Sequence, residues 1–291
     1  MNRVISLILF SVIIVITMGC VSCSKNDNLI NSENQEGNIN EGNDPNFKIV
    51  SNTDQELSSI NRKVVVFGIE IYAVSTVEDS KLLHAANVMA QYLDNDENGV
   101  IDNQNVVDKM LENKAFLVMW KTESDLSSLN PPPGRLGQDL GNDETVPNFV
   151  SGGKTGRFDA SLEEVWHIIT HAGYSKAYPN VFAENAGTSL TNAMDVARGG
   201  NFTSIPSSYP TEAWYTYDDS TCAYDCQATE YFYWAMTSIL GAQVNRLDEI
   251  QQEWRLNTKE KVQTTDSAIY NLLTNPTYKF PINLPDGTYK R

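Results

Sequence analysis

Two of the three histidines in this chain, His167 and His171, lie four residues apart. On a helix this spacing places both imidazoles on one face, about one turn apart, as two ligands of a single metal ion must be. Glu163 and Glu164 lie one turn before His167, so either carboxylate shares that face. We therefore predict a transition-metal site that binds zinc, with Glu164 as the catalytic base. The alternative is that both histidines are hydrogen-bonded core residues.

A third metal ligand is expected from segment 227–240, which is apolar around most of its helical circumference and so predicts a buried helix. Glu230 is the one acid inside this segment. A buried carboxylate is costly unless it is paired or binds a metal, so we assign Glu230 as the third ligand. A salt bridge from Glu230 to Arg198 or Arg246 is the alternative.

The helix that carries the histidines is expected to begin at Ser161, because Ser161 and Glu164 match a capping box. Gly173 supplies a natural end for it. The preceding region 130–158 is rich in Gly, Pro, Asn and Asp and shows no periodicity. It predicts a long loop, which could cover the histidine helix.

The upstream elements indicate a fold that is mostly helical with a small sheet. Segments 63–74 and 115–120 are rich in β-branched and aromatic residues and are expected to form strands. Segment 78–93 carries apolar residues at helical spacing, and a second helical run, 104–111, follows shortly after it. We therefore expect a mostly helical α+β domain with a small sheet. The resemblance of His167, His171 and Glu230 to the metal ligands of zincins implies that a zincin-like pair of helices holds the metal.

The segment that joins the helices 78–93 and 104–111 has the oxygen spacing of a calcium loop. The expected ligands are the side chains of Asp94, Asp96, Asn98 and Asp102 and the carbonyl group of Val100. Gly99 supplies the sharp turn, and the loop 94–105 resembles EF-hand and dockerin loops over about its first nine residues. The loop departs from that pattern at its twelfth position, where Asn105 replaces a bidentate Glu. We expect a structural calcium ion here; an Asx-rich turn without an ion is the alternative.

Two histidines on one helix and a glutamate on a later one resemble the zincin metallopeptidases of the gluzincin type. In those enzymes His, His and Glu hold zinc, and a carboxylate activates the bound water. The pattern departs from theirs because Ile168 follows His167, where they carry Glu, and Thr170 occupies the position that the inverted motif gives to Glu. The resemblance implies a metal-dependent hydrolase, in particular a peptidase, with Glu164 or else Glu163 as the base. The chain from Lys81 onward also resembles uncharacterised bacterial secreted proteins, which implies no activity.

The N-terminal segment predicts secretion and lipid anchoring. Residues 4–18 form an apolar run behind Arg3, too short for an easy bilayer span and typical of a signal peptide. Cys20 or Cys23 follows in a sequence that resembles a bacterial lipobox, so we expect residues 1–23 to form a lipoprotein signal. Residues 24–47 are Asn-rich and acidic and predict a disordered tether. One globular domain, 48–291, would then be held on the outer side of a bacterial membrane, in the periplasm or at the cell surface.

Charge and cysteine content fit that placement. The net charge of −16, with no basic run, excludes nucleic acid as a partner. Outside the cytoplasm Cys222 and Cys226 are expected to form a short disulfide, with a thiolate metal site as the alternative. A rival to the hydrolase is a non-catalytic, calcium-binding surface protein. It would bind a partner or a glycan through aromatic residues of the irregular segment 202–217, such as Trp214, Tyr215 and Tyr217. The sequence itself favours the alternative, in which these residues pack over the core.

Overall fold

The computed structural model describes residues 47–129 and 132–291. The predicted signal peptide, Cys20, Cys23 and nearly all of the predicted tether lie outside these ranges. Phe47, which we assigned to the tether, is buried and stacks on Tyr289 with 5.6 Å between ring centroids. Phe47 therefore belongs to the folded domain and not to the tether. Within the described ranges no helix combines the length and the apolar character needed to cross a bilayer.

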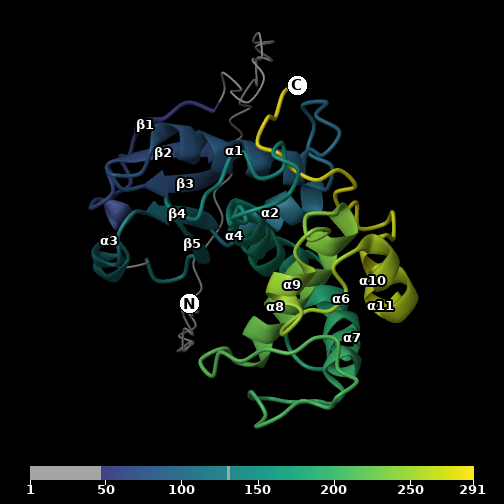
Figure 1. Cartoon of the computed structure of the whole chain (residues 1–291). Helices are drawn as coiled ribbons and strands as arrows, with labels where there is room; N and C mark the ends of the chain where they lie inside the picture. Colours follow the sequence, from purple (N-terminus) through teal and green to yellow (C-terminus); the bar gives the residue numbers. More distant parts are fainter. Residues whose placement is uncertain (1–46, 130–131) are drawn as a thin grey trace, which may run out of the picture.

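One side of the molecule is a five-stranded mixed sheet (Figure 1). In spatial order its strands are β1 (Val50–Ser51), β2 (Arg62–Val66), β3 (Ile69–Ala73), β4 (Phe116–Trp120) and β5 (Gly137–Gly141). Strand β2 runs antiparallel to both β1 and β3, and β4 runs parallel to both β3 and β5.

Two strand expectations need correction. Segment 63–74 forms a hairpin rather than one strand, because Phe67 and Gly68 both adopt positive φ and close a tight two-residue turn. Region 130–158 is not wholly a loop, since it contributes β5. Gly137 at the start of β5 lies under the ring of Phe116, where a Cβ atom would come within 2.4 Å of the ring.

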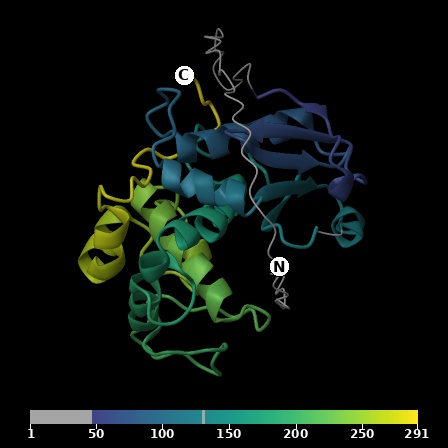
Figure 2. The same cartoon turned by 180° about the vertical axis from the view of Figure 1, so that it is seen from behind.

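The helices of the second half of the chain lie on the opposite side of the molecule from the sheet edge β1, whereas the first and third helices lie beside the sheet (Figures 1 and 2). The helices before the centre of the chain are α1 (Asp79–Leu93), α2 (Gln104–Glu112) and α3 (Glu123–Ser128), with a 3₁₀ turn η1 (Gln55–Leu57). The central ones are α4 (Ser161–Ile169), the π-helix η2 (Thr170–Tyr174), α5 (Ser175–Ala177), α6 (Pro179–Phe182) and α7 (Ser189–Arg198). The last are α8 (Tyr224–Leu240), α9 (Leu247–Ile250), α10 (Lys259–Thr265) and α11 (Ser267–Leu273).

The two faces of the sheet are covered differently. Helices α1 and α4 pack on one face and join it to the main core. The other face carries a small separate cluster of apolar side chains next to η1 and α3: Leu57, Ile60, Tyr72, Phe116, Val118 and Leu129. This arrangement places α4 at the centre of the molecule, between the sheet and the remaining helices.

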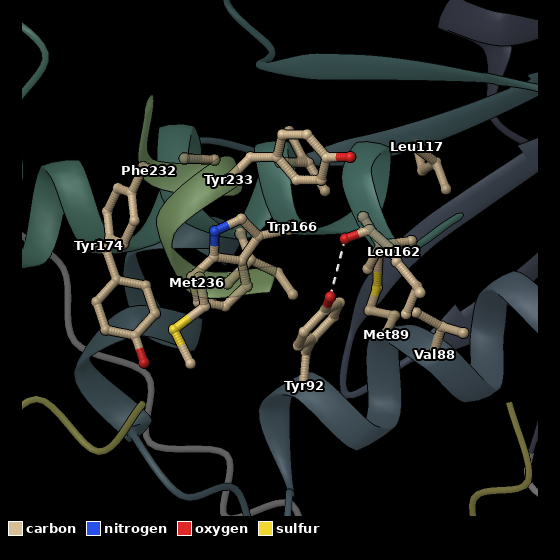
Figure 3. Packing of buried hydrophobic residues seen from close by; sticks show 14 of the residues in the cluster. Val88, Met89, Tyr92, Leu117, Leu162, Trp166, Tyr174, Phe232, Tyr233 and Met236 are labelled. Carbon is tan, nitrogen blue, oxygen red and sulfur yellow. Dashed lines mark hydrogen bonds between the residues drawn. The ribbon is translucent and has the colours of Figure 1, made fainter. Parts of the chain in front are cut away.

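Helix α4 is held there by aromatic packing (Figure 3). Trp166 is fully buried, with Tyr92 of α1 on one side and Phe232 of α8 on the other, at centroid distances of 5.1 and 5.6 Å. The Tyr92 hydroxyl donates a hydrogen bond of 2.8 Å to the carbonyl oxygen of Leu162. Contacts of this kind fix α4 and α8 side by side. The five-stranded sheet and the surrounding helices confirm the expected α+β class.

Candidate metal centre

Glu163, His167 and Glu230 come together where α4 and α8 pack against each other. The Nε2 atom of His167 lies 3.4 Å from Oε1 of Glu230 and 3.8 Å from Oε1 of Glu163. One ligand atom from each residue lies within 4.8 Å of the other two. Within residues 47–129 and 132–291 no other group of three His, Cys, Asp or Glu side chains meets this spacing, and this one could hold a metal ion.

Burial leaves polar atoms of this cluster without hydrogen-bond partners. His167 and Glu230 are only 1% and 2% exposed. In the described part of the chain, neither ring nitrogen of His167 nor Oε1 of Glu230 takes part in a hydrogen bond. A buried polar group in this condition costs about 1–3 kcal/mol. Imidazole nitrogens and carboxylate oxygens are also the atoms through which these side chains bind metal ions.

Negative charge exceeds positive charge in the cluster. Burial raises the pKa of Glu230 to about 8; the charge of His167 opposes this rise and that of Glu163 adds to it. Burial alone would lower the pKa of His167, but the charges of Glu230 and Glu163 outweigh it and raise that pKa. The salt bridges of Glu163 and Glu230 found among the described residues both go to His167, and none goes to Lys or Arg. A cation would therefore be favoured at this place.

Glu230 does not make the salt bridges that were the alternative to metal binding. Arg198 pairs with Asp195 and also bonds the side chain of Gln227. Arg246 pairs with Glu249, with 3.2 Å between Nε and Oε2. Glu230 faces His167 instead. Metal binding by Glu230 stays a prediction.

The start of α4 differs from the expected capping box. Ser161 is the first helical residue rather than the cap, and its hydroxyl has no hydrogen-bond partner in the described part of the chain. Asp159 acts in its place, because its Oδ1 accepts hydrogen bonds from the backbone amides of Ser161 and Val146. Its Oδ2 lies 2.7 Å from Nε2 of His84, the third histidine.

Glu164 points away from the cluster, and Glu163 faces it. The Oε2 atom of Glu164 accepts a hydrogen bond of 2.6 Å from the side chain of Gln138 on β5. Burial, followed by the charges of Glu163 and Asp139, raises the pKa of Glu164 well above its ordinary value. The structure thus distinguishes these two neighbouring glutamates. Glu163 forms an ion pair with His167, whereas the hydrogen bond found for Glu164, our expected base, comes from Gln138.

His171 does not join the three-residue group either. The helix does not end at Gly173 but continues through η2 into α5. The Nδ1 atom of His171 lies 2.7 Å from Oε2 of Glu184. Gly173 serves close packing instead, since a Cβ atom there would lie 2.6 Å from Cγ1 of Val106 on α2.

Two further polar residues, Tyr217 and Glu253, act on the cluster, and neither was assigned to it from the sequence. A hydrogen bond from the side chain of Tyr217 acts on the carboxyl group of Glu230. Glu253 is half-buried, and burial together with the charge of Glu163 raises its pKa to about 7. Glu253 comes from the turn after α9 and shows no pattern that sequence reasoning could use. Its proximity to Glu163 is a product of the fold.

The acidic loop between α1 and α2 has the expected helix–loop–helix setting. Asp94 is fully buried, and its carboxylate accepts hydrogen bonds from the amides of Asn98 and Gly99, while Asp102 accepts one from the amide of Asn95. The amide of Val100 in turn donates to the side chain of Asn98. These bonds belong to an Asx-rich turn and would be compatible with a bound ion. Calcium binding at Asp94, Asp96, Asn98, Val100 and Asp102 stays a prediction.

Two other expectations concern the start of α8 and the segment before it. Cys222 and Cys226 form a disulfide with 5.3 Å between Cα atoms, which confirms the expected pairing. Tyr215 is fully buried and Tyr217 is 8% exposed, and Trp214 donates its indole N–H to Asp266. These aromatic residues therefore pack within the domain, and the stacking surface on which the rival function depended is not formed by Tyr215 and Tyr217.

The fold and this site define an α+β protein with a buried Glu–His–Glu cluster between two central helices. Comparison with known protein families, with curated proteins and with solved structures finds no match to this chain. Function must therefore be argued from the site itself.

Proposed function

We propose that Glu163, His167 and Glu230 bind a divalent transition-metal ion, and that the protein is a metal-dependent hydrolase acting on a peptide. The observation that carries the metal proposal is the convergence of two carboxylates on a buried imidazole with no neutralising Lys or Arg salt bridge among the described residues. One nitrogen and two carboxylate oxygens suit zinc, and three protein ligands leave a coordination position for water.

The hydrolase proposal follows from what such a site supplies. A bound cation acts as a Lewis acid and makes water nucleophilic near neutral pH. The chain's own residues then have separate tasks. His167 and Glu230 fix the position of the cation from the buried side, and Glu163, whose side chain is 13% exposed, lies on the side nearer to solvent.

Metal analysis of matched variants tests the metal proposal. Purified protein should contain about one equivalent of transition metal, and Glu163→Gln and His167→Ala should lose it. Glu164→Gln is the matched control, because it alters the adjacent residue of the same type, which bonds Gln138 instead of facing His167. If Glu163→Gln retains the metal, or if Glu164→Gln loses it to the same extent, the ligand assignment is wrong. Hydrolysis of labelled casein that depends on the metal tests the catalytic part.

We also propose that the protein is lipid-anchored outside the cytoplasm and that calcium stabilises the loop at Asp94. The disulfide Cys222–Cys226 supports an oxidising compartment. Mass spectrometry of the mature N-terminus would distinguish a lipid on Cys20 from one on Cys23, and an unprocessed Met1 would contradict the anchoring. The role of calcium would be structural, because the loop connects α1 to α2 and α1 packs on α4.

A further inference from the structure

His171 and Glu184 form a well-fixed pair of an imidazole and a carboxylate next to the metal cluster. Nδ1 of His171 lies 2.7 Å from Oε2 of Glu184. The other oxygen, Oε1 of Glu184, accepts a hydrogen bond of 2.9 Å from the hydroxyl group of Thr229. Both carboxylate oxygens are thus occupied, and Glu184 is only 8% exposed. The carboxylate has one orientation, and it fixes the orientation of the imidazole.

This geometry determines which ring nitrogen carries the proton. Burial would raise the pKa of Glu184, but the charge of His171 and the hydrogen bonds from His171 and Thr229 hold it below its ordinary value. The carboxylate is therefore ionised and can only accept a hydrogen bond. Neutral His171 must then carry its hydrogen on Nδ1, which leaves Nε2 with a free lone pair. The side chain of His171 is 24% exposed, whereas that of His167 is 1% exposed.

The His171–Glu184 pair is connected to both helices that form the metal cluster, α4 and α8. His171 follows His167 by four residues, about 6 Å along a helix axis. Thr229, which anchors Glu184, directly precedes Glu230 on α8. The charge of Glu184 also acts on the imidazole of His167. The same two segments therefore supply a buried metal cluster and, next to it, a more exposed base with a free lone pair.

We infer that His171 is the proton-transfer residue of the proposed hydrolase and that Glu184 is its positioning residue. This role rests on the proposed function. Nε2 of His171 takes a proton from the attacking water as the water oxygen bonds to the carbonyl carbon of an amide. The same proton passes to the amide nitrogen as the C–N bond breaks. Water and amide thus become a carboxylic acid and an amine, and His171 returns to its starting state.

Two substrates with different leaving groups test this role in the metal-loaded full-length protein. An amine leaves only after protonation, whereas 4-nitrophenolate leaves as an anion. His171→Gln removes activation of water for both substrates but removes protonation of the leaving group for the amide alone. It should therefore lower hydrolysis of fluorescein-labelled casein by about 100-fold or more, and by at least about 10-fold more than that of 4-nitrophenyl acetate, at unchanged metal content. Glu184→Gln should show the same difference between the substrates with a smaller loss.

His84→Gln is the matched control. It removes a second imidazole–carboxylate pair, His84 with Asp159, which has the same length of 2.7 Å but lies outside the cluster. This change should alter the stability of the protein but should not change the ratio of the two hydrolysis rates. If His171→Gln lowers both rates equally, or lowers neither, His171 is not the proton-transfer residue, although the metal proposal can still hold. If the wild-type protein binds metal but hydrolyses neither probe, the hydrolase and the role of His171 are both wrong.

A second measurement does not depend on activity. Nitrogen-15 NMR of the histidine side chains should show His171 with its hydrogen on Nδ1 in the wild-type protein and should show that preference weakened in Glu184→Gln. An imidazole of His171 that carries its hydrogen on Nε2 in the wild-type protein overturns the inference, whatever the rates show.

Discussion

The Nε2 atom of His167 lies 3.4 Å from Oε1 of Glu230, and in the described part of the chain neither atom has a hydrogen-bond partner. The two residues come from helices α4 and α8, and Trp166 and Phe232 on the same helices pack against each other. A buried imidazole and a buried carboxylate at this separation can share either a proton or a cation. Stability and metal binding should therefore respond in opposite ways to changes at Glu230.

Glu230→Gln should stabilise the metal-free protein and weaken metal binding. At pH 9 the wild-type carboxylate is ionised and buried, and Gln removes this charge while keeping the shape. We expect the free energy of unfolding of the metal-free protein to rise by on the order of 2 kcal/mol at that pH, as measured by urea denaturation. Metal affinity, measured by competition with a chelator, should fall by at least about 10-fold. A Gln variant that is less stable without metal would show that Glu230 is not an uncompensated charge.

The stability of the metal-free protein should decrease as pH rises from about 5 to 9. The folded-state pKa values of Glu230, Glu253 and Asp139 are raised to about 8, 7 and 6 respectively, in each case first by burial. A carboxyl group with a raised pKa in the folded state contributes stability below its unfolded pKa and loses it as pH rises through the folded value. The raised pKa of His167 has the same sign.

Urea midpoints across this pH range, with and without saturating metal, measure the effect. Bound metal should flatten the decline, because it neutralises the carboxylates that would otherwise repel one another. Glu253→Gln should remove the part of the decline that lies below about pH 7 and is due to this carboxyl group, and should leave the decline above that pH. A midpoint of the metal-free protein that stays constant or rises between pH 5 and 9 would contradict the assigned shifts.

Part of this site could be predicted from the sequence because it follows from the cost of burial. Glu230 is an acid in an otherwise apolar helix, and this alone indicated a partner, which the structure places at His167. Which of Glu163 and Glu164 faces His167 could not be predicted from the cost of burial. Neighbours on a helix point about 100° apart, so the outcome depends on how α4 is rotated against α8 and β5, which no local pattern specifies.

The partner of His171 could not be predicted because it comes from a separate segment. Nδ1 of His171 lies 2.7 Å from Oε2 of Glu184, which follows α6, and no local pattern in the sequence indicates this pairing. The π-helix η2 was also not predicted, although Thr170 offers a signal, since its hydroxyl bonds the backbone carbonyl groups of Trp166 and His167, and such bonds bend helices. Strand β5 is likewise defined by its partner β4. Its sequence, Gly137–Gly141, has little strand propensity of its own.

Gly173→Ala should disturb the metal cluster by packing alone. The new methyl group would lie 2.6 Å from Cγ1 of Val106 and 3.1 Å from Cγ of Met110, so η2 must move away from α2. We expect a loss of about 1–3 kcal/mol in the free energy of unfolding and weaker metal binding, because His167 lies on the adjoining turn of α4. The double variant Gly173→Ala, Val106→Ala removes the clashing methyl group and should recover part of both losses. No recovery would mean that the close approach at Gly173 does not control the site.

Calcium should raise the melting temperature of the protein through the loop at Asp94. At a concentration about 100-fold above its Kd, an ion that binds only the folded state adds about 2.7 kcal/mol, which corresponds to about 5–10 °C for a domain of this size. Asp94 is fully buried, and burial raises the pKa of its carboxyl group despite the hydrogen bonds from Tyr289, Gly99 and Asn98. An ion at this carboxylate would offset its cost of burial.

Scanning calorimetry with calcium, with magnesium and with a chelator measures the shift. Asp94→Asn should abolish the response to calcium. Asp79→Asn, which changes an exposed acid at the start of the same helix, should retain it. A melting temperature that does not respond to calcium or to the chelator would mean that the loop is an Asx-rich turn held by its own hydrogen bonds. Because α1 packs on α4, a calcium response in the wild-type protein should also protect the amides of α4 from hydrogen exchange.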